Sequence, residues 1–299
     1  MKNRREVLKS LIAAPLIATS LPAFTEKKIT GSNTAKCYQL KTSLNAFCFN
    51  DALLKGKMNL DEVIDFCAEQ QFDAVDITGY YFPGYPNVPS DDYIYHLKKK
   101  AFLSGLEISG TGVRNDFTEA DPLKRKDSVQ LVKNWIEVAQ KLGAPVIRIF
   151  AGNQNPPGYT WDQVAEWMVK DIKECVEYGK QHGIVTGIQN HNDFIRTSAD
   201  VTKIMKMAGS DWLGLILDTG GYRSGDPYKQ IEETINYVVN WQIKEKIFVN
   251  EIEQDTDLSK LIAIIKKSCY KGYIPIETLG EGDPKLKVIN LMAKLREAL

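Results

Sequence analysis

Several short motifs with known chemistry are missing from this chain of 299 residues. No Gly-x-Ser-x-Gly turn presents a serine nucleophile, and no Gly-rich turn follows the first apolar run to cradle a phosphate. Histidine is scarce, since only His96, His182 and His191 occur. These absences argue against a serine hydrolase, against a dinucleotide-binding open sheet and against a multinuclear zinc site.

Cysteine is also sparse and scattered. The five cysteines are Cys37, Cys48, Cys67, Cys175 and Cys269. Because no two of them form a Cys-x-x-Cys pair, a structural zinc site of the finger type is disfavoured. The count is odd, so at least one thiol is free unless it pairs with another chain; the sequence leaves the pairing open.

Charge of either sign is not in excess, with 38 basic and 38 acidic residues. No long basic run appears after the N-terminus. Nucleic acid is therefore excluded as an expected partner, because neutralising its phosphates needs a clustered Lys/Arg surface.

The N-terminus carries a targeting pattern. The pair Arg4-Arg5 precedes an apolar stretch from Leu11 to Phe24, which is too short to span a bilayer. We interpret residues 1–25 as a secretory signal of the twin-arginine type and residues 26–41 as a linker. The mature protein is then expected in the periplasm without a membrane anchor. An amphipathic N-terminal helix is the alternative.

Short apolar runs alternate with amphipathic ones after residue 41. The runs that predict strands are Ser43–Phe49, Ala74–Thr78, Glu107–Val113, Val146–Phe150, Thr186–Gln189, Leu213–Asp218, Val238–Ile243 and Tyr273–Glu277. The patterns between and after them predict helices over Asp61–Gln71, Ser90–Ser104, Asp121–Leu142, Thr160–His182, Ala199–Ala208, Pro227–Ile235, Asp257–Cys269 and Pro284–Ala298. Eight strands, each followed by a helix, predict a single (β/α)₈ TIM barrel over residues 42–299.

Polar side chains end several of these strands, where a barrel carries its active site. Asp218 and Glu277 each follow an apolar run, and Gln189 and Gln242 end two other strands. A buried carboxylate costs desolvation energy unless a cation or a hydrogen-bond donor pairs with it. The pattern favours a functional site, although carboxylates bonded only to neighbouring groups remain the alternative.

The stretches around these residues resemble the sugar phosphate isomerase/epimerase group of xylose isomerase-like barrels. The motifs are Gln189-Asn190-His191, Leu217-Asp218-Thr219-Gly220, Trp241-Gln242-Ile243-Lys244-Glu245 and Ile276-Glu277-Thr278-Leu279-Gly280. The resemblance covers about residues 40–299. It implies one divalent ion, commonly manganese or magnesium, bound by a Glu, an Asp, a His and a Glu, with the two glutamates moving protons on the substrate.

Two positions depart from that pattern. Gln189 stands where the first Glu would be, and Gln242 stands where the His would be, whereas Asp218 and Glu277 match. An amide oxygen can bind a hard cation but brings no charge. The expectation is therefore a weakened Mn²⁺ or Mg²⁺ site made of these four residues.

Because Gln189 cannot take a proton, Glu277 is the expected base. His191 is a candidate second group, or it only orients a loop. Lys244 lies two residues after Gln242, so strand alternation points both to the same side. Lys244 would stabilise an enolate or pair with Glu277.

Further residues are candidates for binding a substrate. Arg148, Asn153 and Arg223 would hold an anionic or hydroxyl-rich molecule, and Tyr80 belongs to an aromatic loop that would face a sugar ring. For Arg148 and Arg223 the alternative is pairing within the protein. For the aromatic loop it is covering the barrel mouth.

The expected function is that of a sugar isomerase or epimerase that abstracts a proton beside a carbonyl through an enediolate-type intermediate. The isomerase class is favoured over the lyase class. The alternatives are a lyase that cleaves keto-glycosides in the same site, or a carbohydrate-binding barrel without catalysis. The expected partner is a small neutral carbohydrate, and a homo-oligomer stays open.

Overall fold

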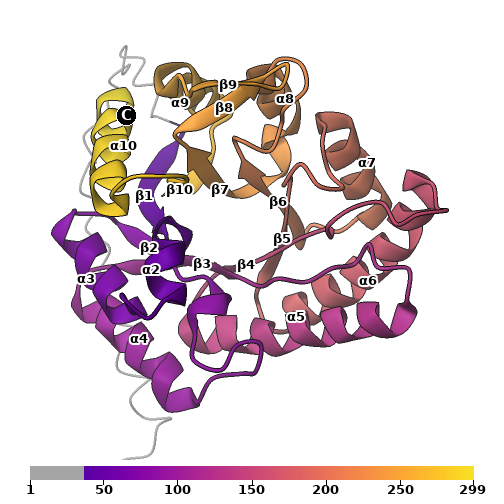
Figure 1. Ribbon diagram of the computed structural model, residues 1–299, viewed down its shortest axis with the longest axis horizontal. Helices are drawn as coiled ribbons and strands as arrows, with labels where there is room; N and C mark the ends of the chain where they lie inside the picture. The colour runs from indigo at the N-terminus through magenta and orange to yellow at the C-terminus, as the bar shows by residue number, and fades with distance from the viewer. Residues whose placement is uncertain (1–36) are drawn as a thin grey trace, which may run out of the picture. The chain divides into compact units, whose positions relative to one another are not determined.

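The computed structural model describes residues 37–299, in which eight parallel strands close into a barrel surrounded by helices (Figure 1). The barrel strands are β1 (Gln39–Asn45), β2 (Ala74–Asp76), β3 (Glu107–Gly112), β4 (Val146–Ile149), β5 (Val185–Gln189), β6 (Leu213–Asp218), β7 (Val238–Lys244) and β10 (Lys271–Glu277). Their order around the barrel is β1-β10-β7-β6-β5-β4-β3-β2. The predicted single (β/α)₈ barrel is confirmed. The predicted signal and residues 26–36 of the predicted linker lie outside the described residues.

Apart from the short helix over Asn50–Leu54, which was not predicted, the helices within residues 37–299 follow the amphipathic patterns of the sequence closely. They are α2 (Asn50–Leu54), α3 (Leu60–Glu69), α4 (Asp91–Leu103), α5 (Pro122–Leu142), α6 (Trp161–Gln181), α7 (Ser198–Ala208), α8 (Pro227–Thr234), α9 (Leu258–Lys267) and α10 (Pro284–Ala298). Local chemistry sets their ends. Ser90 caps α4 by accepting from the backbone N–H of Tyr93, and Gly143 ends α5 in the left-handed region at φ 86°. None of the helices within residues 37–299 is long and apolar enough to cross a membrane.

Side chains fill the interior of the barrel, and two glycines make room for them. A Cβ on Gly110 would lie 2.7 Å from Asp76 Oδ2 and 3.1 Å from Asn240 Nδ2. A Cβ on Gly187 would lie 2.4 Å from Ile216 Cδ1. The lumen around these two glycines is therefore filled by side chains, as expected for a barrel of this type.

The first strand differs from its prediction. β1 begins at Gln39, before residue 42 where the sequence placed the start of the barrel, and it ends at Asn45. The apolar residues Ala46–Phe49 form a short 3₁₀ helix, which the Asn45 side chain caps by accepting from Phe47 N–H. Phe49 packs edge-to-face on Phe66 with ring centroids 5.2 Å apart. The sequence predicts a strand here, because a buried helical turn and a buried strand both appear as a short run of apolar residues.

A β-hairpin after the seventh barrel strand was not predicted. It consists of β8 (Lys246–Val249) and β9 (Ile252–Asp255), which pair antiparallel. All four residues of β9 are exposed, so no alternation of apolar and polar residues marks this strand in the sequence. The hairpin stands over the barrel mouth beside β7 and supplies part of the site described below.

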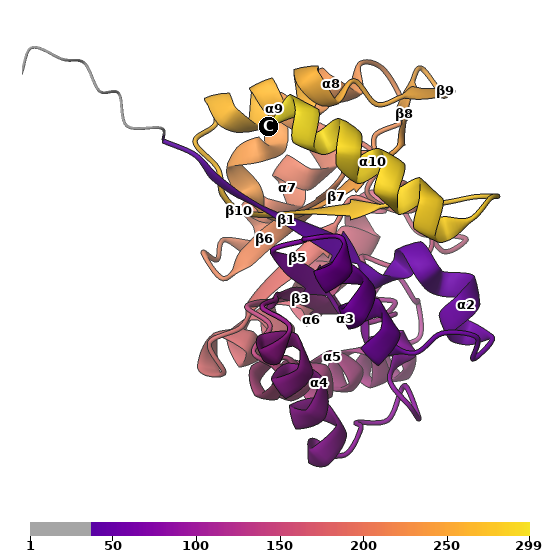
Figure 2. The same cartoon turned by 90° about the vertical axis from the view of Figure 1, so that its left-hand side faces the viewer.

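A disulfide joins Cys37 to Cys269 and answers the question of cysteine pairing. It lies at the seam where the first strand meets the last, because Gln39 in β1 pairs with Lys271 in β10. Figure 2 shows β1 and β10 side by side along this seam. The three other cysteines are free and buried. The bond thus fastens the barrel where its sheet closes.

Replacing both bridged cysteines by serine (Cys37→Ser with Cys269→Ser) is expected to lower the free energy of unfolding by about 2–4 kcal/mol. The cause is the lost constraint on the unfolded chain, since the bridge spans 232 residues. Urea unfolding with and without dithiothreitol measures the effect. Dithiothreitol should destabilise the wild type and leave the double variant unchanged; equal sensitivity of the two proteins would contradict the assignment.

Candidate functional site

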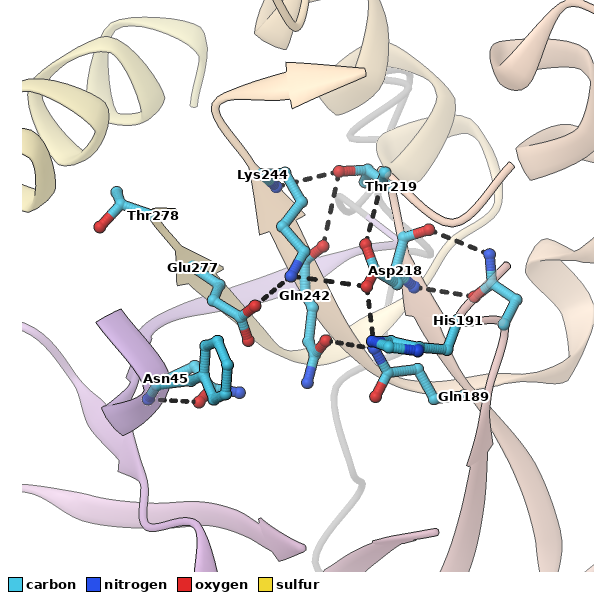
Figure 3. Close-up of polar contacts among 12 residues, drawn as sticks. Asn45, Gln189, His191, Asp218, Thr219, Gln242, Lys244, Glu277 and Thr278 are labelled. Atoms are coloured by element: carbon cyan, nitrogen blue, oxygen red, sulfur yellow. Dashed lines mark hydrogen bonds and ion pairs between the residues drawn. The ribbon is translucent and has the colours of Figure 1, made fainter. Parts of the chain in front are cut away.

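Five polar side chains from four strands meet at the carboxyl end of the barrel (Figure 3). They are Gln189 of β5, Asp218 of β6, Gln242 and Lys244 of β7, and Glu277 of β10. The strand register aligns them, since Asp218 pairs with Gln242 and Glu277 pairs with Lys244. Each is at most 8% exposed. Charged groups buried this far from water interact strongly. The partner of each charged group therefore determines whether that group can bind a cation or accept a proton.

A hydrogen-bond network fixes Asp218 in the centre of this group. Gln189 Nε2 donates to Asp218 Oδ2 at 2.8 Å and to Gln242 Oε1 at 2.6 Å. Gly220 N–H donates to Asp218 Oδ1 at 2.9 Å. Asn190 closes the network from behind, because its Oδ1 accepts from Asp218 N–H at 2.9 Å. Both carboxylate oxygens of Asp218 are thus held by donors of the protein itself.

The side chain of Lys244 reaches between the two carboxylates. Its Nζ lies 3.5 Å from Asp218 Oδ2 and forms an ion pair with Glu277 Oε1, as Figure 3 shows. Burial alone would lower the pKa of Lys244, but the attraction of Asp218 and Glu277 outweighs burial and raises the pKa above its ordinary value. The amine therefore carries its proton at neutral pH. The sequence placed Lys244 on the correct side and left open which group it meets.

Above this group a cavity of about 610 Å³ opens to solvent. Asp218, Lys244 and Glu277 form part of its lining, together with Arg223 and residues of the β8–β9 hairpin. The Arg223 guanidinium lies over the Phe248 ring, 4.3 Å from its centroid. The cavity is large enough for a monosaccharide, and the charged groups lie on its wall.

A second cavity of about 540 Å³ adjoins the first, because His191 and Asp193 line both. Tyr80 and Asn153 line the second cavity. The His191 imidazole is half exposed, and its Nδ1 lies 2.5 Å from Asp193 Oδ2. His191 therefore stands between the two cavities, oriented by Asp193.

The predicted substrate-binding residues are distributed unequally. Arg223 lies in the first cavity, and Tyr80 and Asn153 lie in the second. Arg148 is 5% exposed and lines neither cavity. It donates to the Val113 carbonyl and to Tyr80 Oη, each at 2.7 Å. Arg148 thus supports the wall of the second cavity by holding Tyr80.

One buried acid near the site, Asp76, was not predicted as a candidate residue. Asp76 ends β2, is 8% exposed and points into the lumen near Gly110. Burial raises the pKa of Asp76 to about 7, with Arg148 opposing the shift and Glu277 adding to it. Asp76 lay inside the predicted strand Ala74–Thr78, so it did not stand at a strand end. The available signal was an acid in an otherwise apolar strand.

The donor set does not suit the Mn²⁺ or Mg²⁺ ion that the family resemblance implies. Within residues 37–299 no group of three or more His, Cys, Asp or Glu side chains is placed to hold a metal ion. Gln189 presents its amide nitrogen to Asp218, and its buried Oε1 has no hydrogen-bond partner among these residues. Turning the amide around would set Oε1 against the oxygens of Asp218 and Gln242, which repel it. The space between the acids is taken by an ammonium group.

A family model described as a xylose isomerase-like TIM barrel matches residues 64–298. Among solved structures, the fold is similar to 3-keto-D-glucoside 4-epimerase YcjR from E. coli in its apo form, with a TM-score of 0.70, 14% identity, and coverage of 87% of this chain and 99% of that chain. An L-ribulose 3-epimerase has a TM-score of 0.70 at 14% identity and 87% and 96% coverage. The IolI protein with a bound zinc atom has a TM-score of 0.69 at 14% identity and 86% and 96% coverage. At such identities the likeness shows the fold. None of the curated protein sequences matches the chain.

The substitution Asp76→Asn is expected to remove a pH-dependent loss of stability. The raised pKa of Asp76 in the folded state means that its stability contribution is complete below about pH 4 and is lost as the pH rises to about 7. The stability of the variant relative to wild type should therefore increase by up to about 4 kcal/mol between about pH 4 and pH 8. Urea unfolding across this range measures it.

The matched control is Asp127→Asn, at an exposed position on α5. This control should follow the wild-type stability at every pH. A parallel course of the Asp76→Asn and wild-type curves would contradict the raised pKa.

Proposed function

The chain belongs to the family of xylose isomerase-like TIM barrels, and on that premise we propose that it is a sugar isomerase or epimerase that abstracts a proton beside a carbonyl. One observation carries the proposal: a buried carboxylate, Glu277, and a buried ammonium, Lys244, face the same cavity. Proton abstraction next to a carbonyl needs a base for the C–H proton and a positive group for the developing oxyanion. Two proteins of similar structure, a 3-keto-glucoside 4-epimerase and an L-ribulose 3-epimerase, belong to the same reaction class, which supports the proposal.

Glu277 is the proposed base. Lys244 holds its Oε1, and Oε2 is the oxygen that accepts the proton from the carbon next to the carbonyl. The electrons of that C–H bond form the C=C bond of an enediolate, and the carbonyl oxygen takes the negative charge. Returning the proton to the neighbouring carbon gives an isomer once the hydroxyl proton has moved to the oxyanion and left a new carbonyl behind. Returning it to the original carbon from the other face gives an epimer.

The neighbouring residues favour a single base on one face of the substrate. Gln189 cannot accept a proton, and it is tied to Asp218 and Gln242. Return of the proton by Glu277 itself gives aldose–ketose isomerisation. Epimerisation requires a second proton donor, for which His191 at the edge of the cavity is the candidate. The predicted Mn²⁺ or Mg²⁺ ion takes no part in these steps, because the donor set does not suit it.

The proposed substrate is a small neutral carbohydrate. Phe47, Tyr80 and Phe150 line the second cavity, and aromatic faces of this kind pack on sugar rings. Asn153 lines the same cavity and its amide is a hydrogen-bond partner for hydroxyl groups.

The substitution Glu277→Gln is expected to lower turnover by about 10²–10⁴-fold while the fold survives, because the amide cannot accept a proton. The assay incubates L-ribulose and 3-keto-D-glucosides in deuterated water and follows deuterium uptake and product structure by NMR. Glu281→Gln, on the exposed loop after β10, is the matched control and should keep wild-type activity.

Three outcomes of this assay separate the candidate functions. Exchange with a retained carbon skeleton supports isomerisation or epimerisation. Release of the aglycone from the keto-glucoside would instead identify a lyase. Sugar binding without deuterium uptake in any substrate would show that the protein binds carbohydrate without catalysis. The assignment of Glu277 as the base would then be rejected.

Export to the periplasm is also part of the proposal. The disulfide between Cys37 and Cys269 supports it, because such bonds persist in oxidising compartments. Changing Arg4 and Arg5 to lysine is expected to retain the protein in the cytoplasm, as judged by cell fractionation. Unchanged export of this variant would reject the twin-arginine route, and cytoplasmic wild type would reject export itself.

A further inference from the structure

The carboxylates of Asp218 and Glu277 share one positive group, and that group belongs to the protein. Lys244 Nζ lies 3.5 Å from Asp218 Oδ2 and is ion-paired with Glu277 Oε1. Lys244 is 8% exposed, and both acids are 4% exposed. A charged pair at this depth is stable only when each charge has a close partner. The ammonium of Lys244 is therefore the positive partner of both carboxylates.

The charges of the site leave little room for a second cation. Two carboxylates and one ammonium give a net charge of −1, because Gln189 and Gln242 are neutral. A divalent ion added beside the ammonium would raise the positive charge to +3 against −2, with the like charges a few ångströms apart. The amide of Gln189 would also have to release Asp218, which it holds through Nε2 at 2.8 Å.

We propose that the ammonium of Lys244 takes the place of the divalent ion in this barrel, so that the site works without a metal. The inference rests on the proposed isomerase or epimerase function. An ammonium has three N–H donors. Two point to Asp218 and Glu277, and the third is available to a substrate oxygen in the cavity that Lys244 lines.

The chemistry of this arrangement balances without another reactant. When Glu277 accepts the C–H proton, the C–H electrons form the C=C bond and the carbonyl oxygen becomes an oxyanion. That oxyanion accepts a charge-assisted hydrogen bond from Lys244 Nζ. Glu277 then returns the proton to the former carbonyl carbon. The proton of the neighbouring hydroxyl moves to the oxyanion, so that the carbonyl now stands on the neighbouring carbon and the isomer is released. The two neutral glutamines and the lysine thus have one common explanation, namely that an ammonium group replaces the divalent ion.

The test is a titration with Mn²⁺ alone, followed by electron paramagnetic resonance of the free ion. Wild type is expected to show no stoichiometric binding. The double variant Gln189→Glu with Lys244→Met supplies a third carboxylate and removes the ammonium. It should bind Mn²⁺ at least about tenfold more tightly than wild type. Lys246→Met, at an exposed position of the same cavity, is the matched control for the titration and should also show no stoichiometric Mn²⁺ binding.

Lys244→Arg keeps the positive charge and should also exclude Mn²⁺, which preserves the test if the double variant does not fold. One equivalent of Mn²⁺ bound to wild type with Lys244 intact would overturn the inference. Deuterium exchange by wild type should persist after treatment with EDTA.

The exchange assay also separates this inference from the proposed function. Exchange lost in EDTA and restored by Mn²⁺ would reject the metal-free site and keep the isomerase. Absence of exchange with every keto-sugar would reject the isomerase, and the Mn²⁺ titration would still decide which cation the acids hold.

Discussion

The first barrel strand pairs with the last over six residues, from Gln39 opposite Lys271 to Leu44 opposite Ile276. This pairing turns an open sheet into a closed one, so the ends of β5, β6, β7 and β10 surround one axis. Closure also shuts water out of the lumen, where Asp76 and Asn240 pack beside Gly110. The strength of every charge interaction at the rim depends on this exclusion of water, because Coulomb interactions weaken as the local dielectric rises.

The polar group at the strand ends is best understood as one unit. Asp218 accepts from Gln189 and Gly220 and contacts Lys244. Loss of the Gln189 amide or of the Lys244 ammonium would leave a buried carboxylate short of a partner, which costs several kcal/mol. The amides of Gln189 and Gln242 and the ammonium of Lys244 therefore act together. The amides add no negative charge, and the ammonium offsets one of the two carboxylate charges.

Much of the fold follows from apolar periodicity. Seven of the predicted strands overlap the observed ones at nearly their full length, because parallel barrel strands are buried on both sides and appear as short apolar runs. The prediction of a strand was wrong for Ala46–Phe49, because a buried 3₁₀ turn contains the same kind of apolar residues as a buried strand. The β8–β9 hairpin was not predicted, because its second strand is fully exposed and has no alternation of apolar and polar residues, and its first strand contains a run of only three apolar residues.

The site was predictable in part for the same reason. Strand ends and alternation placed Gln189, Asp218, Gln242, Lys244 and Glu277 on one rim. The sequence could not decide that Lys244 Nζ meets both acids, because a long flexible side chain can reach several partners. It also could not show that Arg148 supports Tyr80 rather than lining a cavity, since that depends on contacts across three strands.

The bridge between Cys37 and Cys269 converts most of the barrel into a covalent ring. Gln189, Asp218, Gln242 and Lys244 lie within that ring, whereas Glu277 lies beyond its last residue. A cut in any surface loop between residues 37 and 269 would leave the fragments tethered to each other. A cut between Cys269 and β10 would free the segment bearing the proposed base, which only strand pairing to β1 and β7 and helix packing would then retain.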